Sequence, residues 1–130
     1  MTVRPLVLVV DDMADTRRLT RRVLERSGLR VVEAGTGEAA LRAATRDRPA
    51  AIVLDLRLPG ISGFEVARTI RSDPDPTFAA TPILACSASV QAEVRREALD
   101  AGADAFEGKP FAVAGFADLI RGLISQRAAS

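Results

Sequence analysis

The sequence AIVLDLRLPG, Ala51–Gly60, contains an apolar run that ends in an acid. The run Ala51–Leu54 predicts a buried parallel strand, and Pro59-Gly60 predicts the turn that follows it. A carboxylate at the end of a buried strand is costly unless it has a use. In open α/β sheets, ligands bind beyond the carboxyl ends of the strands. We therefore expect Asp55 to lie at the functional site.

Apolar segments alternate with helical patterns along the whole chain. Strands are predicted over 6–10, 30–34, 51–55, 82–86 and 103–107, and helices over about 14–27, 36–46, 62–72 and 90–101, with a last helix around 116–124. This alternation predicts a parallel sheet covered by helices on both faces. The expected fold is an α/β, doubly wound (βα)5 three-layer sandwich. We expect one domain over 1–130 with a core over about 6–124, and 30–34 as an edge strand.

Local signals predict where the helices begin and end and which stripes they bury. Thr36 and the capping box Ser62–Glu65 open two helices, and Gly28 closes the first. The predicted inner stripes are Leu19, Val23 and Leu24 in the first helix, and Phe116, Leu119, Ile120, Leu123 and Ile124 in the last. The segment 73–77, DPDPT, predicts a rigid loop, because its prolines disfavour helix and strand.

The first predicted helix also carries a basic run, for which two interpretations stay open. Its members are Arg17, Arg18, Arg21, Arg22 and Arg26. A solvated helix face is the simpler interpretation, and a docking surface is the alternative.

Composition limits the possible functions. The chain has 130 residues, a net charge of +1 and one cysteine, so the totals favour neither nucleic acid nor a membrane surface as a partner and fit a cytoplasmic protein. No apolar run reaches the roughly twenty residues of a membrane helix. The absence of histidine excludes histidine acid–base chemistry and histidine metal ligands. Among 18 basic residues there is a single lysine, Lys109, which suggests a position where a compact ammonium is needed.

Polar residues end or follow four of the five predicted strands. Asp11 and Asp12 follow the first, Asp55 ends the third, Ser87 follows the fourth and Lys109 follows the fifth. Parallel strands bring these positions to one edge of the sheet. Carboxylates without histidine or cysteine suit Mg²⁺, and a hydroxyl and an ammonium suit phosphate oxygens. The set therefore predicts phosphoryl transfer with an aspartate as the nucleophile.

Each of these residues also has a simpler explanation when it is taken alone. Asp11 and Asp12 could cap the first helix, Asp55 could be a turn residue, Ser87 could cap a helix and Lys109 could be a surface charge. Their coincidence at strand ends is what favours a common site.

In these positions and their order, the sequence resembles the receiver domain of two-component response regulators, over about Leu6–Ile124. The resemblance implies a flavodoxin-like, CheY-like sheet of strand order 2-1-3-4-5. It implies that Asp55 is the phosphoacceptor. It also implies that Mg²⁺ is held by Asp12, Asp55 and the backbone carbonyl of Arg57, with Asp11 acting through water.

The resemblance assigns the remaining residues to phosphate binding and switching. Ser87 matches the switch hydroxyl, Lys109 the phosphate-binding lysine, and Phe106 the aromatic switch position three residues earlier, although Phe106 is also a plausible core residue. The Lys109–Pro110 peptide bond is expected to be cis, as in the family.

The function implied by the resemblance is that of a bacterial response regulator receiver, and not of an enzyme acting on other molecules. A sensor histidine kinase or a histidine phosphotransfer protein would phosphorylate Asp55, and the protein would catalyse only its own phosphorylation and dephosphorylation. Phosphorylation would then change the surface formed by 90–101, 103–107 and the last helix. That surface would engage an unknown protein target, with the receiver acting as a monomer or as a phosphorylation-dependent dimer.

Other interpretations stay beside this one. The chain is expected to be a stand-alone receiver, but it could be excised from a larger regulator or a hybrid kinase. It could also be a constitutive interaction module that is not phosphorylated. A phosphatase is rejected, because its general acid would stand two residues after Asp55, where this chain has Arg57.

Overall fold

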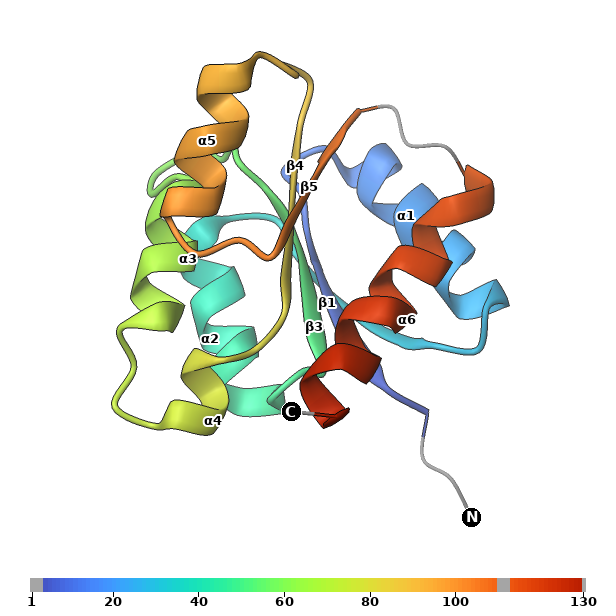
Figure 1. The fold of residues 1–130 in the computed structure, drawn as a ribbon. Coiled ribbons are helices and arrows are strands. Elements are labelled where there is room, and N and C mark those ends of the chain that lie inside the picture. Colours follow the sequence, from blue (N-terminus) through green and yellow to red (C-terminus); the bar gives the residue numbers. More distant parts are fainter. Residues whose placement is uncertain (1–3, 110–112, 130) are drawn as a thin grey trace.

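A five-stranded parallel sheet lies at the centre of the computed structural model, which describes residues 4–109 and 113–129 (Figure 1). The strands are β1 (Leu6–Val10), β2 (Arg30–Ala34), β3 (Ala51–Asp55), β4 (Ile83–Ser87) and β5 (Ala105–Gly108). Their order across the sheet is β2-β1-β3-β4-β5, with β2 and β5 at the edges. The predicted fold class, strand order and edge position of β2 are confirmed.

Helices cover both faces of the sheet and make the three layers (Figure 1). Helices α1 (Ala14–Arg26) and α6 (Val113–Ala129) lie on one face, and α2 (Gly37–Asp47), α3 (Gly63–Arg71) and α5 (Ala92–Asp100) lie on the other. The short helix α4 (Pro76–Ala79) precedes β4. Among the described residues, no helix combines the length and the apolar character that a bilayer crossing requires.

Strand β3 is buried along its whole length because both of its faces pack against helices. Ile52 and Leu54 point into the core beneath α2, α3 and α5, whereas Ala51 and Val53 point into the core beneath α1 and α6. This alternation follows from the two-residue period of a strand. A strand with two apolar faces can lie only in the interior of the sheet, which places Asp55 next to its centre.

The start of α3 packs tightly against the end of β3. The Ser62 hydroxyl caps α3 by accepting a hydrogen bond from Glu65 N at 3.2 Å, as the capping box predicts. Gly63 N donates to Leu56 O at 3.0 Å, and a Cβ on Gly63 would lie only 2.7 Å from Leu56 Cα and would also overlap the Asp55 carbonyl. Glycine is therefore required where α3 approaches the backbone that carries Asp55.

Two predictions about helices are wrong. Leu19 does not belong to the inner stripe of α1: it is 59% exposed, and Thr20 is buried in its place. Thr20 is tolerated there because its hydroxyl donates to Thr16 O at 3.0 Å. The prolines of 73–77 do not exclude a helix either, because Pro76 begins α4, where a missing N–H costs nothing, and Asp75 caps it.

Other local predictions agree with the structure within a few residues. Gly28 ends α1 with φ +87°, and the backbone bond from Leu29 N to Leu24 O closes the cap. In α6, Phe116 and Ile120 are buried, and Leu119, Leu123 and Ile124 pack against the same core. Strand β4 begins and ends one residue later than expected, so Ser87 is its last residue.

Candidate functional site

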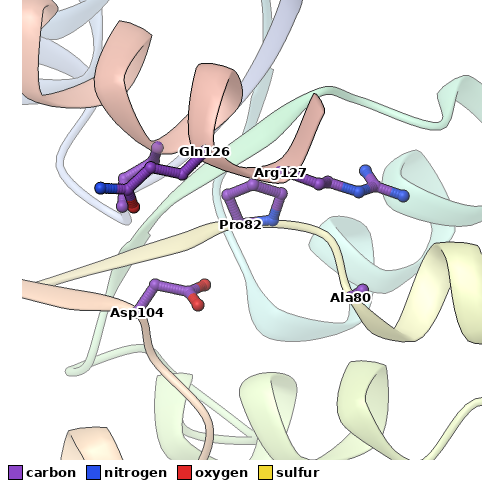
Figure 2. Close-up of a pocket in the computed structure, with 6 residues that line it drawn as sticks. Ala80, Pro82, Asp104, Gln126 and Arg127 are labelled. Carbon is purple, nitrogen blue, oxygen red and sulfur yellow. The ribbon is translucent and has the colours of Figure 1, made fainter. Parts of the chain in front are cut away.

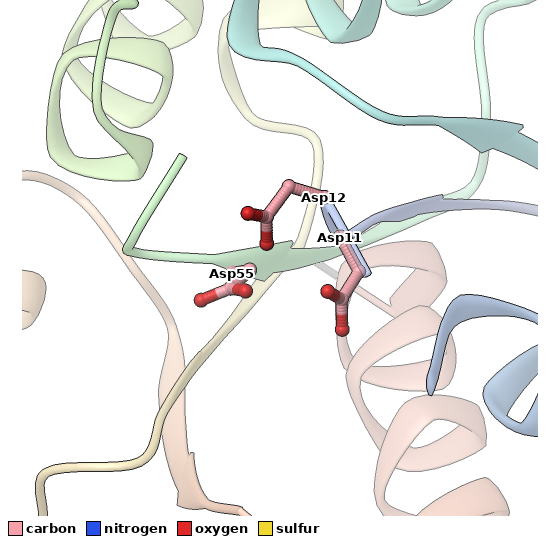
Figure 3. A group of neighbouring side chains, drawn as sticks. All are labelled: Asp11, Asp12 and Asp55. Carbon is pink, nitrogen blue, oxygen red and sulfur yellow. The ribbon is translucent and has the colours of Figure 1, made fainter. Parts of the chain in front are cut away.

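Three aspartates meet at the carboxyl edge of the sheet (Figure 3). Asp11 and Asp12 follow β1, and Asp55 ends the neighbouring strand β3. The register pairs Val10 with Leu54, so Asp11 and Asp55 leave adjacent strands at the same level. One oxygen from each carboxylate lies within 4.8 Å of the others; Asp11 and Asp55 are buried and Asp12 is exposed. The acidic cluster is therefore buried on one side and open on the side of Asp12.

Lys109 binds both buried carboxylates and offsets part of their negative charge. Its Nζ donates to Asp11 Oδ2 at 2.6 Å and to Asp55 Oδ2 at 3.0 Å. The Lys109 side chain is only 18% exposed, and its backbone N–H donates to Ser87 O at 2.9 Å, which anchors it to β4. The single lysine of the chain thus joins the ends of β1, β3 and β4, and the interpretation of Lys109 as a surface charge is wrong.

Backbone N–H groups bind the other oxygen of each buried carboxylate. Met13 N donates to Asp11 Oδ1 at 2.9 Å, and Arg57 N donates to Asp55 Oδ1 at 3.0 Å. Both bonds span two residues, a turn that aspartate forms readily. Each carboxylate is held by one ammonium and one amide, so its orientation is fixed before any ligand arrives.

Burial and hydrogen bonding act in opposite directions on the titrating groups. Burial raises the pKa of Asp55 above its ordinary value, although the bonds from Lys109 and Arg57 lower it. Burial lowers the pKa of Lys109, but the bonds to Asp11 and Asp55 outweigh this, so that its pKa is raised. Lys109 therefore stays charged at neutral pH, whereas burial disfavours the charged form of Asp55.

The predicted switch residues lie on β4 and β5. The Ser87 side chain is buried, and its Oγ accepts a hydrogen bond from Ser89 N at 3.1 Å. Phe106 is half-buried, packs against the core beneath α5 and pairs with Ala85 in the sheet. The predicted cis bond before Pro110 lies outside the described residues.

Arg17 is a contact residue of this site that the sequence did not single out. Its Nη1 donates to the backbone carbonyl of Asp11 at 2.7 Å, and its Nε donates to Glu33 Oε1 at 2.8 Å. In the sequence it belongs to the basic run, and nothing separates it there from its neighbours. Only the packing of α1 against β2 shows that Arg17 and Arg21 bind Glu33, while Arg18, Arg22 and Arg26 stay exposed.

An open hollow borders the acidic cluster. It has a volume of about 590 Å³ and is lined by Asp12, Leu56, Arg57, Leu58, Pro59, Ser62 and Phe64. A second hollow, of about 250 Å³, lies at the opposite edge of the sheet between the end of α6 and the starts of β4 and β5 (Figure 2). There the Asp104 carboxylate accepts bonds from Arg71 and from Ile83 N, so it has a structural role. Of these two hollows, the one beside Asp12 borders the acidic cluster.

The donor chemistry of the acidic cluster fits a hard divalent cation. Three carboxylates supply oxygen ligands and no softer donor, a set that suits Mg²⁺ better than zinc or copper. Mg²⁺ usually keeps several water ligands. Because Asp12 is exposed, a cation bound here could keep water at its remaining coordination positions.

Comparison with known proteins gives a consistent result. The sequence model of the response regulator receiver domain matches residues 7–121. The transcriptional regulatory protein PrrA of Mycobacterium tuberculosis is 39% identical over 124 residues, which cover 95% of this chain and 51% of PrrA. The chain spans about half the length of the curated relatives it matches.

Solved structures show the same fold. The receiver domain of the Francisella response regulator 1452 superimposes with a TM-score of 0.87 at 25% identity, covering 95% of this chain and 99% of that one. The receiver domain of the Pseudomonas aeruginosa sensor histidine kinase PA1611 has a TM-score of 0.86 at 29% identity, with coverage of 95% and 99%. That structure has a magnesium ion coordinated in its active-site cleft.

Proposed function

Because the chain belongs to the response regulator receiver domain family, we propose that Asp55 is the residue that accepts a phosphoryl group from a phosphorylated histidine. Receiver domains of response regulators are signalling proteins that histidine kinases phosphorylate. The observation that carries the assignment is the position of Asp55: it lies at the end of β3, within 3.0 Å of the Lys109 ammonium and beside two further aspartates. From this proposed reaction we predict that a histidine kinase or a histidine phosphotransfer protein donates the phosphoryl group to this chain.

In the proposed step, a carboxylate oxygen of Asp55 attacks phosphorus in line with the P–N bond of the donor. The O–P bond forms as the P–N bond breaks, and the histidine nitrogen keeps the electron pair of the broken bond and takes up a proton. The product is an aspartyl phosphate on this chain. The hollow lined by Asp12 and Arg57 borders the acidic cluster, and it is the proposed side from which the donor approaches Asp55.

The charges of the site are arranged for this step. Asp11, Asp12 and Asp55, with the backbone carbonyl of Arg57, are the proposed holders of Mg²⁺. When bound, the ion would supply positive charge that offsets the negative charge of the phosphoryl oxygens. Lys109 contacts Asp55 before the reaction and is proposed to transfer one hydrogen bond to a phosphoryl oxygen after it. We propose that water hydrolyses the aspartyl phosphate at the same site, with the same charged groups binding the phosphoryl oxygens.

Ser87 and Phe106 are the proposed switch. The Ser87 oxygen accepts from Ser89 N, so its O–H remains available to donate to a phosphoryl oxygen. Movement of Ser87 toward the phosphate opens space into which half-buried Phe106 turns. The change biases the surface formed by α5, β5 and α6 toward a second packing, which an unknown protein target recognises.

A constitutive interaction module is not favoured, because the acids, the hydroxyl and the ammonium are all in place. A stand-alone receiver and a receiver within a longer regulator place the same demands on the site. The oligomeric state and the cytoplasmic location inferred from the sequence stay predictions.

The test is incubation with acetyl phosphate and Mg²⁺ followed by mass measurement of the intact protein. Wild type should gain one phosphoryl group and Asp55→Asn should gain none. Asp118→Asn, which alters an exposed acid on α6, is the matched control and should label like wild type. If Asp55→Asn were still labelled, the acceptor would be a residue other than Asp55. No labelling of wild type, when an established receiver labels in parallel, would favour the constitutive module.

A further inference from the structure

We propose that Arg17 is a positioning residue that holds the Asp11–Asp12 peptide in place and thereby sets the affinity of the acidic cluster for a divalent cation. The inference rests on the proposed function of that cluster as a Mg²⁺ site. Arg17 Nη1 donates to the carbonyl oxygen of Asp11 at 2.7 Å. That carbonyl belongs to the peptide linking Asp11 to Asp12, so a single bond constrains the backbone from which both carboxylates project.

The Asp11–Asp12 peptide lies outside β1, where the regular ladder of the sheet ends. Asp11 N still donates to Ala34 O at 3.1 Å, but the carbonyl on the other side of Asp11 is bound by a side chain, Arg17. Without that bond, the Asp11 carboxylate would keep its contacts with Lys109 and Met13 N, but the Asp11–Asp12 peptide would lose its side-chain anchor. The exposed Asp12 carboxylate would then be held less firmly relative to Asp55 on β3.

Arg17 is itself fixed by Glu33 on β2. The Nε–Oε1 distance is 2.8 Å, and both side chains are only 21% exposed. The guanidinium also passes close to Gly35, where an added Cβ would lie 3.3 Å from Nη1. The planar fork of arginine lets Nε reach Glu33 while Nη1 reaches Asp11. A lysine would have to reach both acceptors from a single nitrogen, whereas arginine reaches each of them from a separate nitrogen.

Arg21 provides a matched comparison. It also binds Glu33, with Nη1 2.8 Å from Oε2, but its Nε goes to Glu25 at 3.1 Å and not to Asp11. The two arginines therefore share the ion pair with Glu33, but only Arg17 contacts the Asp11 carbonyl and only Arg21 contacts Glu25. A loss of Mg²⁺ affinity that appears only when Arg17 is changed therefore points to the Asp11 contact.

Simple electrostatics and positioning predict opposite results. Removing a cation near an acidic cluster makes the cluster more negative, which favours Mg²⁺ binding in both arginine variants. Loss of positioning weakens binding, and it does so only when Arg17 is changed. Supporting contacts around metal ligands typically change metal affinity about 10- to 100-fold.

The experiment is calorimetric titration of Mg²⁺ into wild type, Arg17→Gln, Arg17→Lys and Arg21→Gln, each checked for folding by far-UV circular dichroism. We expect the Mg²⁺ dissociation constant to rise about tenfold in Arg17→Gln. It should also rise in Arg17→Lys, which keeps the charge, and stay equal or fall in Arg21→Gln. Arg17→Lys keeps the proposal testable if Arg17→Gln does not fold.

Two outcomes would overturn the proposal: unchanged or tighter binding in both Arg17 variants, or an equal loss in Arg21→Gln. If wild type itself bound no Mg²⁺, the proposed function of the acidic cluster would fail instead. Because the readout is cation binding, the result does not depend on phosphorylation.

Discussion

Replacement of Lys109 by methionine tests how the buried acids are kept together. Methionine has a similar unbranched stem but no charge, so the change removes the ammonium bound to Asp11 at 2.6 Å and to Asp55 at 3.0 Å. These carboxylate side chains are only 5% and 9% exposed. Removing one partner of a buried ion pair costs about 3–5 kcal/mol. Because the cluster is open toward Asp12, we expect a somewhat smaller loss, about 2–4 kcal/mol in metal-free buffer.

Mg²⁺ should reduce this deficit. In wild type the ammonium and the cation compete for the same carboxylates, so the variant gains more from the cation than wild type does. A tenfold tighter dissociation constant in the variant would restore about 1.4 kcal/mol at saturating Mg²⁺. The variant should nevertheless label poorly with acetyl phosphate, since methionine cannot bind a phosphoryl oxygen.

The assay is urea unfolding followed by far-UV circular dichroism, with and without Mg²⁺, because the chain has neither Trp nor Tyr to report by fluorescence. Arg18→Met is the control: its pair with Asp15 is exposed and spans 3.6 Å, so the change should cost less than about 1 kcal/mol. Equal stability of Lys109→Met and wild type without metal would refute the neutralising role. A smaller Mg²⁺ effect in the variant than in wild type would refute the competition.

Three further predictions concern other parts of the fold. Glu33→Gln should cost about 1 kcal/mol near neutral pH, because bonds from neighbouring arginines lower the pKa of Glu33. Wild type loses this advantage as the pH falls below 4.5, the ordinary pKa of glutamate, and through the lowered pKa of Glu33 in the folded protein. The unfolding free energies of wild type and Glu33→Gln should therefore converge in acid. A difference that does not change with pH would contradict the role given to the Glu33 carboxylate. Gly63→Ala should lower the unfolding free energy measured in urea by about 1–3 kcal/mol, because its methyl would lie 2.7 Å from Leu56 Cα; a neutral effect would show that α3 can shift. Changing exposed Arg18 and Arg22 to glutamate should slow phosphotransfer from the cognate kinase and leave acetyl phosphate labelling unchanged, and equal kinase rates would exclude α1 as the docking face.

Cys86 shows how strongly the site is embedded in the sheet. It pairs with Asp55 across β3 and β4 and is 1% exposed, and burial raises the pKa of its thiol far above the ordinary value. A buried, protonated thiol is unreactive. Asp55, at the carboxyl edge of the sheet, therefore lies directly beside a fully buried residue of the core.

Much of this architecture was predictable because it depends on the spacing of apolar residues within short stretches of the sequence. Alternation of apolar segments fixed the number and type of the main elements, and turn and cap residues such as Gly28 and Ser62 located their ends. The acids and the lysine could be assigned to one edge because all strands of a parallel sheet end on the same side. The resemblance to receiver domains added the strand order.

The wrong predictions concern positions whose structure depends on residues that are distant in the sequence. Leu19 fits a helical apolar stripe, yet the packing of α1 on the sheet turned Thr20 inward instead. Pro76 disfavours a helix interior but suits a first turn, and only the structure shows that α4 begins there. Periodicity identifies the faces of an element, whereas the side that is buried depends on what packs against it.

The sequence alone singled out Asp55 as a candidate, because an acid that ends a fully apolar strand is costly to bury without a use. Its contacts were decided by the tertiary structure. Lys109 and Asp11 are 98 residues apart in the chain, and the 2.6 Å bond between them exists because β1, β3, β4 and β5 place their ends together in a fixed register. Arg17 became distinguishable from the other arginines of α1 for the same reason: a hydrogen bond depends on distances of a few ångströms, which sequence spacing does not determine across separate elements.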